Sequence, residues 1–264
     1  MKTIYTTLPI YDRIEKQTFE RSKQSVKDRI WSIICPTDEL PSFQWIDNTA
    51  TTVTKIETID LGNNATDITS LLTLPTLEAL TSDSYFVYYG GVIGGTLDCG
   101  KQYLRITTDA GTYYSDWFDA EDVTDDNWKC LKIDFSNICD LGNILYQTGF
   151  TQTAWLLSEP METSFPIEEE GVKNGEGLFV PTFRRQSKKY IARIANMPDF
   201  MVDVFNRMRL HDTVLLTDLV GDQNEVFNLE VEHEWTDDKY YALITLTFDY
   251  DETVIISGCC NNFV

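Results

Sequence analysis

The chain has 264 residues, with 21 Lys and Arg against 42 Asp and Glu, and its formal net charge is −21 at pH 7. A hydrophobic fraction of 42% and an aromatic fraction of 12% are enough to build a core, which excludes a wholly disordered chain. No apolar run approaches the ~20 residues of a membrane-spanning helix, and residues 1–14 lack the features of a signal peptide. The negative charge also argues against indiscriminate nucleic-acid binding, because such binding needs cations that neutralise phosphates.

Residues 1–45 are predicted to form an extended N-terminal arm. Residues 11–31 are polar and permit a helix, but they carry no regular apolar stripe, so we expect them to become ordered by packing on a neighbour. Residues 40–45 (LPSFQW) are expected to be extended, because a residue that precedes proline avoids the helical region. The aromatic side chains of Phe43 and Trp45 then need a pocket, either in this chain or in an adjacent subunit.

Residues 46–161 are predicted to form a β-sandwich-like domain. Short runs rich in β-branched and aromatic residues, at 49–59, 84–90 and 128–135, are separated by turns that contain Gly, Asp or Asn. Residues 108–112 (TDAGT) suit a tight hairpin between two further strands. Many short strands at such spacing are typical of sandwiches.

A linker and a second domain are predicted to follow. Residues 162–182 contain three consecutive Glu and three Gly, which favours a solvated loop. Over residues 183–264 the pattern changes to α+β, with the order β-α-β-β-β. The helix, at 199–209, has an amphipathic apolar stripe, an acidic residue in its first turn and basic residues in its last. The expected fold class is therefore mainly β with an α+β C-terminal part.

Basic residues are concentrated in two segments. Residues 1–30 hold seven basic and four acidic side chains, and residues 184–209 hold seven basic and two acidic ones, so the rest of the chain is strongly acidic. Such segments can dock on an acidic surface of another copy or of a neighbouring protein, although two solvated helix faces would give the same pattern. The candidate contacts between subunits are Arg184, Arg185, Lys188, Lys189, Arg193, Glu230, Glu232, Glu234, Phe43 and Trp45.

The sequence offers little for catalysis. His233 shares the apolar face of a predicted strand with Val231 and Trp235, which favours a hydrogen-bonded core residue over a catalyst. The three Glu on the opposite face of that strand are expected to face water or the basic segment of a neighbour. Neither a nucleophile elbow nor a phosphate loop with its Lys-Ser/Thr pair is present. We therefore predict no catalytic residues and no enzymatic activity.

No metal or cofactor is predicted either. The six cysteines show no zinc-ligand spacing, and we expect reduced thiols, with Cys99 and Cys130 as small buried hydrophobes. The acidic residues at 119–127 are interpreted as a solvated loop rather than a calcium site.

Four stretches of the chain, in the same order, resemble virion proteins of tailed bacteriophages that infect Bacteroidetes, the crAss-like phages included. They are residues 8–17 (LPIYDRIEKQ), 40–44 (LPSFQ), 111–118 (GTYYSDWF) and 190–250, the last with LHD at 210–212 and EW at 234–235. The resemblance implies a structural component of the neck or tail, such as a ring protein stacked beneath the portal or a tail-hub protein. No catalytic motif accompanies it.

The leading hypothesis is thus a structural virion protein that assembles as a cyclic homo-oligomer and docks neighbouring neck and tail proteins. Its ring would contribute to a conduit through which genomic DNA passes without specific binding, because like charges repel. We expect it in the virion, after synthesis in the host cytoplasm, with no membrane partner. The alternative is a carbohydrate-binding or receptor-binding tail module that uses exposed Trp and Tyr side chains, and a glycan-cleaving enzyme is a third reading.

Overall fold

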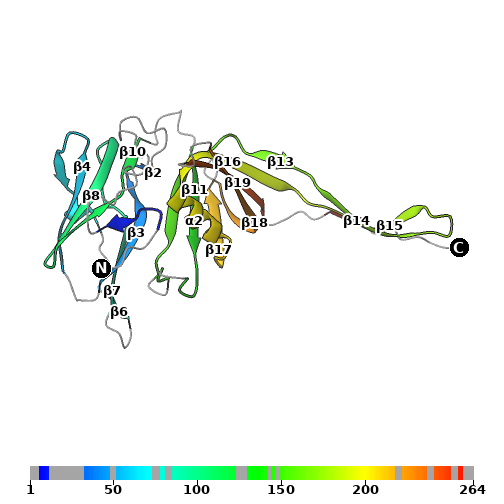
Figure 1. Ribbon diagram of the computed structural model, residues 1–264, viewed down its shortest axis with the longest axis horizontal. Helices are drawn as coiled ribbons and strands as arrows, with labels where there is room; N and C mark the ends of the chain where they lie inside the picture. Colours follow the sequence, from blue (N-terminus) through cyan, green and yellow to red (C-terminus); the bar gives the residue numbers. More distant parts are fainter. Residues whose placement is uncertain are drawn as a thin grey trace.

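The chain is mainly β, with a single α-helix among the residues that the computed structural model describes. Those residues are 6–11, 33–47, 52–72, 78–80, 85–122, 130–141, 144–146, 149–217, 222–236, 241–250 and 255–257. A β-rich body carries a thin arm that projects from one end (Figure 1). The predicted fold class is therefore confirmed.

The elements fall into three groups. The first half of the body contains β1 (Ile10–Tyr11), β2 (Ile33–Pro36), β3 (Glu39–Asp47), β4 (Val53–Asp60), β5 (Ala65–Asp67), the 3-10 helix η3 (Thr69–Leu71), β6 (Glu78–Leu80), β7 (Tyr85–Val92), β8 (Gly100–Thr108), β9 (Thr112–Ser115), β10 (Phe118–Glu121), β11 (Cys130–Ser136) and β12 (Gln152–Leu157). The second half contains β13 (Glu162–Ser164), β16 (Lys189–Pro198), α2 (Asp199–Met208), β17 (Thr213–Thr217), β18 (Gln223–Trp235) and β19 (Tyr241–Tyr250). The arm contains β14 (Ile167–Lys173), β15 (Phe179–Gln186) and β20 (Ile255–Ser257).

One 14-stranded sheet joins the two halves of the body. Its path is β1-β9-β8-β10-β2-β12-β11-β17-β18-β19-β16-β13, with β4 attached to β8 and β5 to β4. The junction is the antiparallel pair β11–β17, which runs from Lys132 opposite Thr217 to Ser136 opposite Thr213. The predicted domains at 46–161 and 183–264 therefore share one sheet and one main hydrophobic core. Pairing between distant segments leaves no local trace in composition, which is why the sequence suggested separate units.

The described N-terminal residues pack in the core instead of forming an arm. β2 lies between β10 and β12, and all four of its residues are buried, as in a strand that is covered on both faces. β3 forms a second sheet with β7 and β6, and it packs against β2 and β12. The prediction of an arm over residues 1–45 is thus wrong for 6–11 and 33–45, while residues 1–5 and 12–32 lie outside the described part.

Phe43 and Trp45 fill a pocket in their own chain. Both side chains are fully buried. Their rings stack with centroids 6.0 Å apart, and the Trp45 ring lies 6.1 Å from that of Tyr113. Their predicted role as contacts between subunits is therefore wrong, and the aromatic run at the end of the expected arm is part of the core.

The predicted solvated linker is mostly a hairpin. β14 and β15 pair from Ile167 opposite Gln186 to Lys173 opposite Phe179, with a bulge after Glu170. The turn is closed by the Asn174 carboxamide oxygen, which accepts hydrogen bonds from the backbone N–H groups of Glu176 and Leu178, and Gly177 supplies a positive φ of 81°. Charge and glycine content suggested a loop, but an Asn-Gly turn between two extended runs is a hairpin signal.

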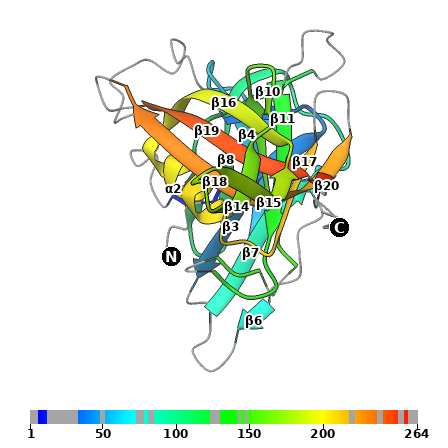
Figure 2. The ribbon, with the colours of Figure 1, turned by 90° about the vertical axis from the view of Figure 1, so that its right-hand side faces the viewer.

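The C-terminal module matches its predicted order. β16, α2, β17, β18 and β19 follow one another, and α2 lies against one face of β16, β18 and β19 (Figure 2). The helix begins after Pro198, has Asp199 in its first turn and Arg207 in its last, and so complements its dipole. Its apolar stripe is buried as the periodicity predicts, through Phe200, Met201, Val202, Val204, Phe205 and Met208.

The burial of Trp45 predicts a large effect on stability. Trp45→Ala should lower the free energy of unfolding by about 3–5 kcal/mol, the usual cost of truncating a buried large aromatic side chain. Guanidinium denaturation measures the change, with Ile138→Ala as a control, because Ile138 is 80% exposed on the body. A Trp45→Ala protein as stable as the wild type would contradict the buried position.

Candidate functional site

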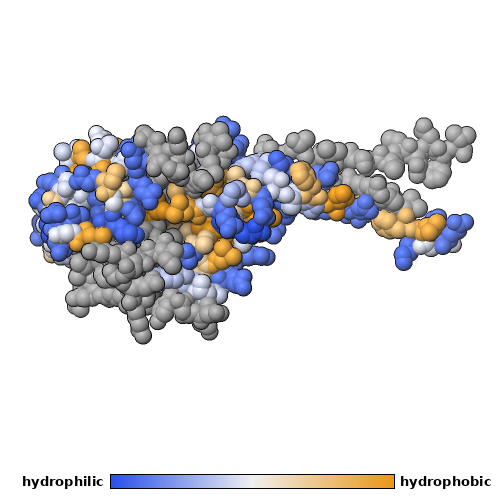
Figure 3. Space-filling view, turned by 90° about the horizontal axis from the view of Figure 1, so that it is seen from above, coloured by the Kyte–Doolittle hydropathy of each residue, from blue (hydrophilic) through white to orange (hydrophobic). Residues whose placement is uncertain are grey.

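The arm exposes apolar side chains far from the core. Its hairpin segment, residues 165–186, extends well beyond the body (Figure 1), and orange apolar patches recur along it in the space-filling view (Figure 3). The exposed large apolar residues of this segment are Phe165, Ile167, Val172, Leu178 and Phe179. Large exposed apolar patches typically mark a contact with a partner.

The arm continues directly from the edge of the large sheet. β13 pairs with β16 up to Ser164 opposite Lys189, the Ser187 N–H donates to the carbonyl of Pro166 at 3.3 Å, and β14 pairs with β15 from Ile167 onward. The hairpin is therefore one ribbon with the body, and backbone hydrogen bonds rather than a loose linker set its direction.

Three of the basic residues assigned to docking contact partners in their own chain. The guanidinium of Arg193 lies 2.7 Å from the Glu162 carboxylate, and the Lys189 ammonium lies 3.5 Å from that of Glu230. The Lys188 ammonium lies 4.6 Å from the ring centroid of Tyr190. These contacts join β13, β16 and β18 near the root of the arm. Such partly exposed ion pairs contribute at most about 1 kcal/mol each, so the residues remain able to exchange partners.

The remaining charged candidates lie on two strands. The backbone register places Arg185 opposite Glu168 and Arg184 opposite Glu169 in the hairpin, and the side chains of these two arginines lie outside the described part. Opposite charges at directly paired positions favour that register. Glu232 and Glu234 are exposed on β18 and form no ion pair within the described residues.

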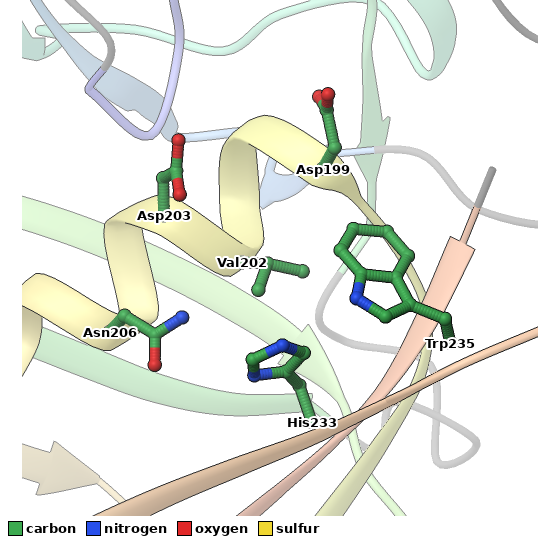
Figure 4. Close-up of a pocket in the computed structure, with 6 residues that line it drawn as sticks. All are labelled: Asp199, Val202, Asp203, Asn206, His233 and Trp235. Atoms are coloured by element: carbon green, nitrogen blue, oxygen red, sulfur yellow. The ribbon is translucent and has the colours of Figure 1, made fainter. Parts of the chain in front are cut away.

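A groove lies between α2 and the end of β18 (Figure 4). It has a volume of about 600 Å³ and is lined by Asp199, Val202, Asp203, Asn206, His233 and Trp235. The rings of His233 and Trp235 lie 5.9 Å apart at 81°, edge to face, and both side chains are exposed. The expectation of a core histidine at position 233 is therefore wrong. From Phe227 to Trp235, β18 has no buried side chain, so its apolar face is only partly covered there.

His211 is held in a polar network beside the end of α2. Its Nδ1 lies 3.0 Å from the carbonyl oxygens of Arg207 and Met208, and its Nε2 lies 2.5 Å from the Tyr146 hydroxyl. With Nδ1–H donating to the helix carbonyls, Nε2 accepts from Tyr146, which itself accepts from the Gln152 amide. Burial lowers the pKa of His211 and raises the pKa of Tyr146. The network therefore caps the C-terminal end of the helix.

The thiols and carboxylates form no metal centre within the described part. No group of three or more His, Cys, Asp or Glu there is arranged to hold a metal ion. Burial raises the pKa of the Cys130 thiol to about 12 and also raises the pKa of Cys35, so both stay protonated. Cys99 is exposed, which corrects the expectation of burial, because it lies in an irregular segment before β8. Asp119 pairs with Lys101 at 3.4 Å, while residues 123–129 lie outside the described part.

Comparisons with known proteins found no relative. No family model, curated protein or solved structure matches the chain. Among the described residues, no helix is long and apolar enough to cross a membrane.

The lowered pKa of His211 predicts a pH dependence of stability. The unfolded chain binds a proton at position 211 more readily than the folded chain, so the stabilising contribution is complete above the unfolded pKa of about 6.5. This stabilising contribution is lost as the pH falls from the pKa of the unfolded chain toward the lower pKa of His211 in the folded chain. The free energy of unfolding, measured by denaturation between pH 7.5 and pH 5, should therefore decrease more steeply for the wild type than for His211→Gln. Equal slopes would contradict the lowered pKa.

Proposed function

We propose that the protein is a structural subunit of a phage neck or tail that assembles as a cyclic homo-oligomer and docks neighbouring virion proteins. The observation that carries the proposal is the projecting hairpin, residues 165–186, with five exposed apolar side chains on a segment that is continuous with the body. An arm of this kind reaches past the surface of its own subunit. A partner that covers it removes apolar surface from water, which favours association.

The sequence resemblance to virion proteins of Bacteroidetes-infecting phages supports the same role. In a heterologous interface, the arm of one copy lies on a different surface of the next copy, and a rotation that closes gives a ring. The net charge of −21 is compatible with a ring around passing DNA, because an acidic surface repels phosphates and discourages binding.

The alternative, a carbohydrate-binding or receptor-binding module, requires an exposed aromatic platform. Trp235 in the groove between α2 and β18 is one such side chain, with 39% of its surface exposed. A binding groove and an assembly arm occupy different parts of the molecule, so the two roles do not exclude each other.

The arm predicts an assembly defect that leaves the fold intact. Leu178→Ser/Phe179→Ser should reduce the oligomer to monomers, because it removes apolar side chains that would contact a neighbouring copy. Both side chains are exposed and do not pack in the core, so the fold should be unchanged. Light scattering coupled to size-exclusion chromatography measures the mass, and circular dichroism checks the fold. The matched control is Ile138→Ser, since Ile138 is 80% exposed on the body. A wild-type protein that stays monomeric at high concentration, or a double variant that assembles normally, would contradict the proposal.

A charge swap tests how the basic segment acts. Arg184→Glu/Arg185→Glu should impair assembly, either because the charges of the hairpin no longer match or because a neighbouring copy needs basic residues there. Adding Glu168→Arg/Glu169→Arg restores opposite charges across the hairpin register. If the quadruple variant assembles again, the pairing within the hairpin is what matters. Docking on an acidic neighbour instead predicts that the quadruple variant remains defective and that salt dissociates the wild-type oligomer.

A further inference from the structure

The two walls of the groove between α2 and β18 present different chemistry. Asp199, Asp203 and Asn206 are spaced at i, i+4 and i+7, which places them on one side of the helix. His233 and Trp235 are two residues apart on β18 and so share a face of the strand. Figure 4 shows the two rings turned toward the helix, with Val202 between the walls.

Both walls are held in place before any ligand arrives. α2 is anchored by six buried side chains, and the end of β18 pairs with β19 in unbroken register from Glu230 opposite Thr247 to Trp235 opposite Ala242. A preorganised groove avoids the entropic cost of ordering its side chains on binding.

Two polar side chains of the groove, those of Asp203 and Asn206, are available to a ligand. Within the described part of the chain, the carboxylate of Asp203 and the amide of Asn206 form no hydrogen bond or ion pair, and only the backbone carbonyl of Asp203 accepts, from Arg207. A carboxylate only accepts hydrogen bonds, whereas the Asn206 amide and the Trp235 indole N–H also donate. Among the described residues, no Lys or Arg lines the groove, and the two carboxylates there repel anions.

We propose that this groove is a saccharide-binding site that takes a neutral pyranose ring. The apolar C–H face of such a ring packs on the exposed indole of Trp235, and its neighbouring hydroxyls donate to Asp203 and accept from Asn206. A cationic ligand would satisfy the Asp203 carboxylate, but it offers nothing to the amide and indole donors. The volume of about 600 Å³ lies within the range of small-ligand pockets. The inference is independent of ring assembly.

Saturation-transfer NMR and calorimetry on the full chain test the site, with maltotriose, cellotriose, mannotriose and chitotriose as probes. At least one should bind saturably. Trp235→Ala and Asp203→Ala should each weaken that binding by about tenfold or more, the loss typical of removing a central contact. Phe227→Ala is the matched control, because Phe227 is exposed on the same strand outside the groove, and near-ultraviolet circular dichroism checks that each variant is folded.

Two results would overturn the proposal. One is the absence of saturable binding by all four saccharides, and the other is binding that Trp235→Ala leaves unchanged. Saturable binding of spermine that depends on Asp203, without any saccharide response, would identify the groove as a cation site instead. The arm variant Leu178→Ser/Phe179→Ser should bind the saccharide like the wild type, so a failure of assembly and a failure of this site are distinguishable.

Discussion

The antiparallel pairing of β11 with β17 is the interaction on which the rest of the structure depends. It joins strands that lie about 80 residues apart in the chain, so it fixes the second half of the body onto the first. The elements of the second half, from α2 to the arm, are therefore oriented relative to the first half by the β11–β17 pair. Because the main core continues across it, the body acts as one rigid base from which the arm projects. An arm on such a base holds a fixed direction relative to the body of its own chain.

Local patterns predicted local structure well. The amphipathic spacing from Phe200 to Met208 identified α2, and the alternation in the last 80 residues identified the strands beside it, because periodicity reports directly on which face is buried. The predictions for residues 162–182 and 33–45 are wrong because the structure of these segments depends on strand pairing, which composition and local periodicity do not report. Glu and Gly content describes solvation rather than pairing, so it hid the β14–β15 hairpin. The burial of β2 comes from neighbours far away in the chain, which no local window can show.

The candidate contacts between subunits show the same difference between local patterns and pairing with distant segments. Charge segregation pointed to the segment around Lys189 and Arg193, but their partners, Glu230 and Glu162, belong to the same chain and reach them only through the sheet. The apolar side chains of the arm are hard to recognise in the sequence because a glutamate triplet and a glycine-rich turn separate them and dominate the composition of the segment. The sequence pattern correctly places His233 and Trp235 on one face of the strand. The groove between them and Asp199, Asp203 and Asn206 runs along the flank of α2, beside its buried stripe, and its position depends on how the helix lies against the sheet.

The position of β14 at the outer edge of its three-stranded sheet has a consequence for aggregation. The backbone N–H and C=O groups of an edge strand can pair with the same strand of another copy, and repeated pairing of this kind produces fibres. Two β14 strands aligned antiparallel about their centre would set Glu170 against Glu170, with further glutamates on both sides, and like charges directly across a ladder are destabilising. The glutamate triplet thus disfavours this symmetric pairing of two arms along their edge strands.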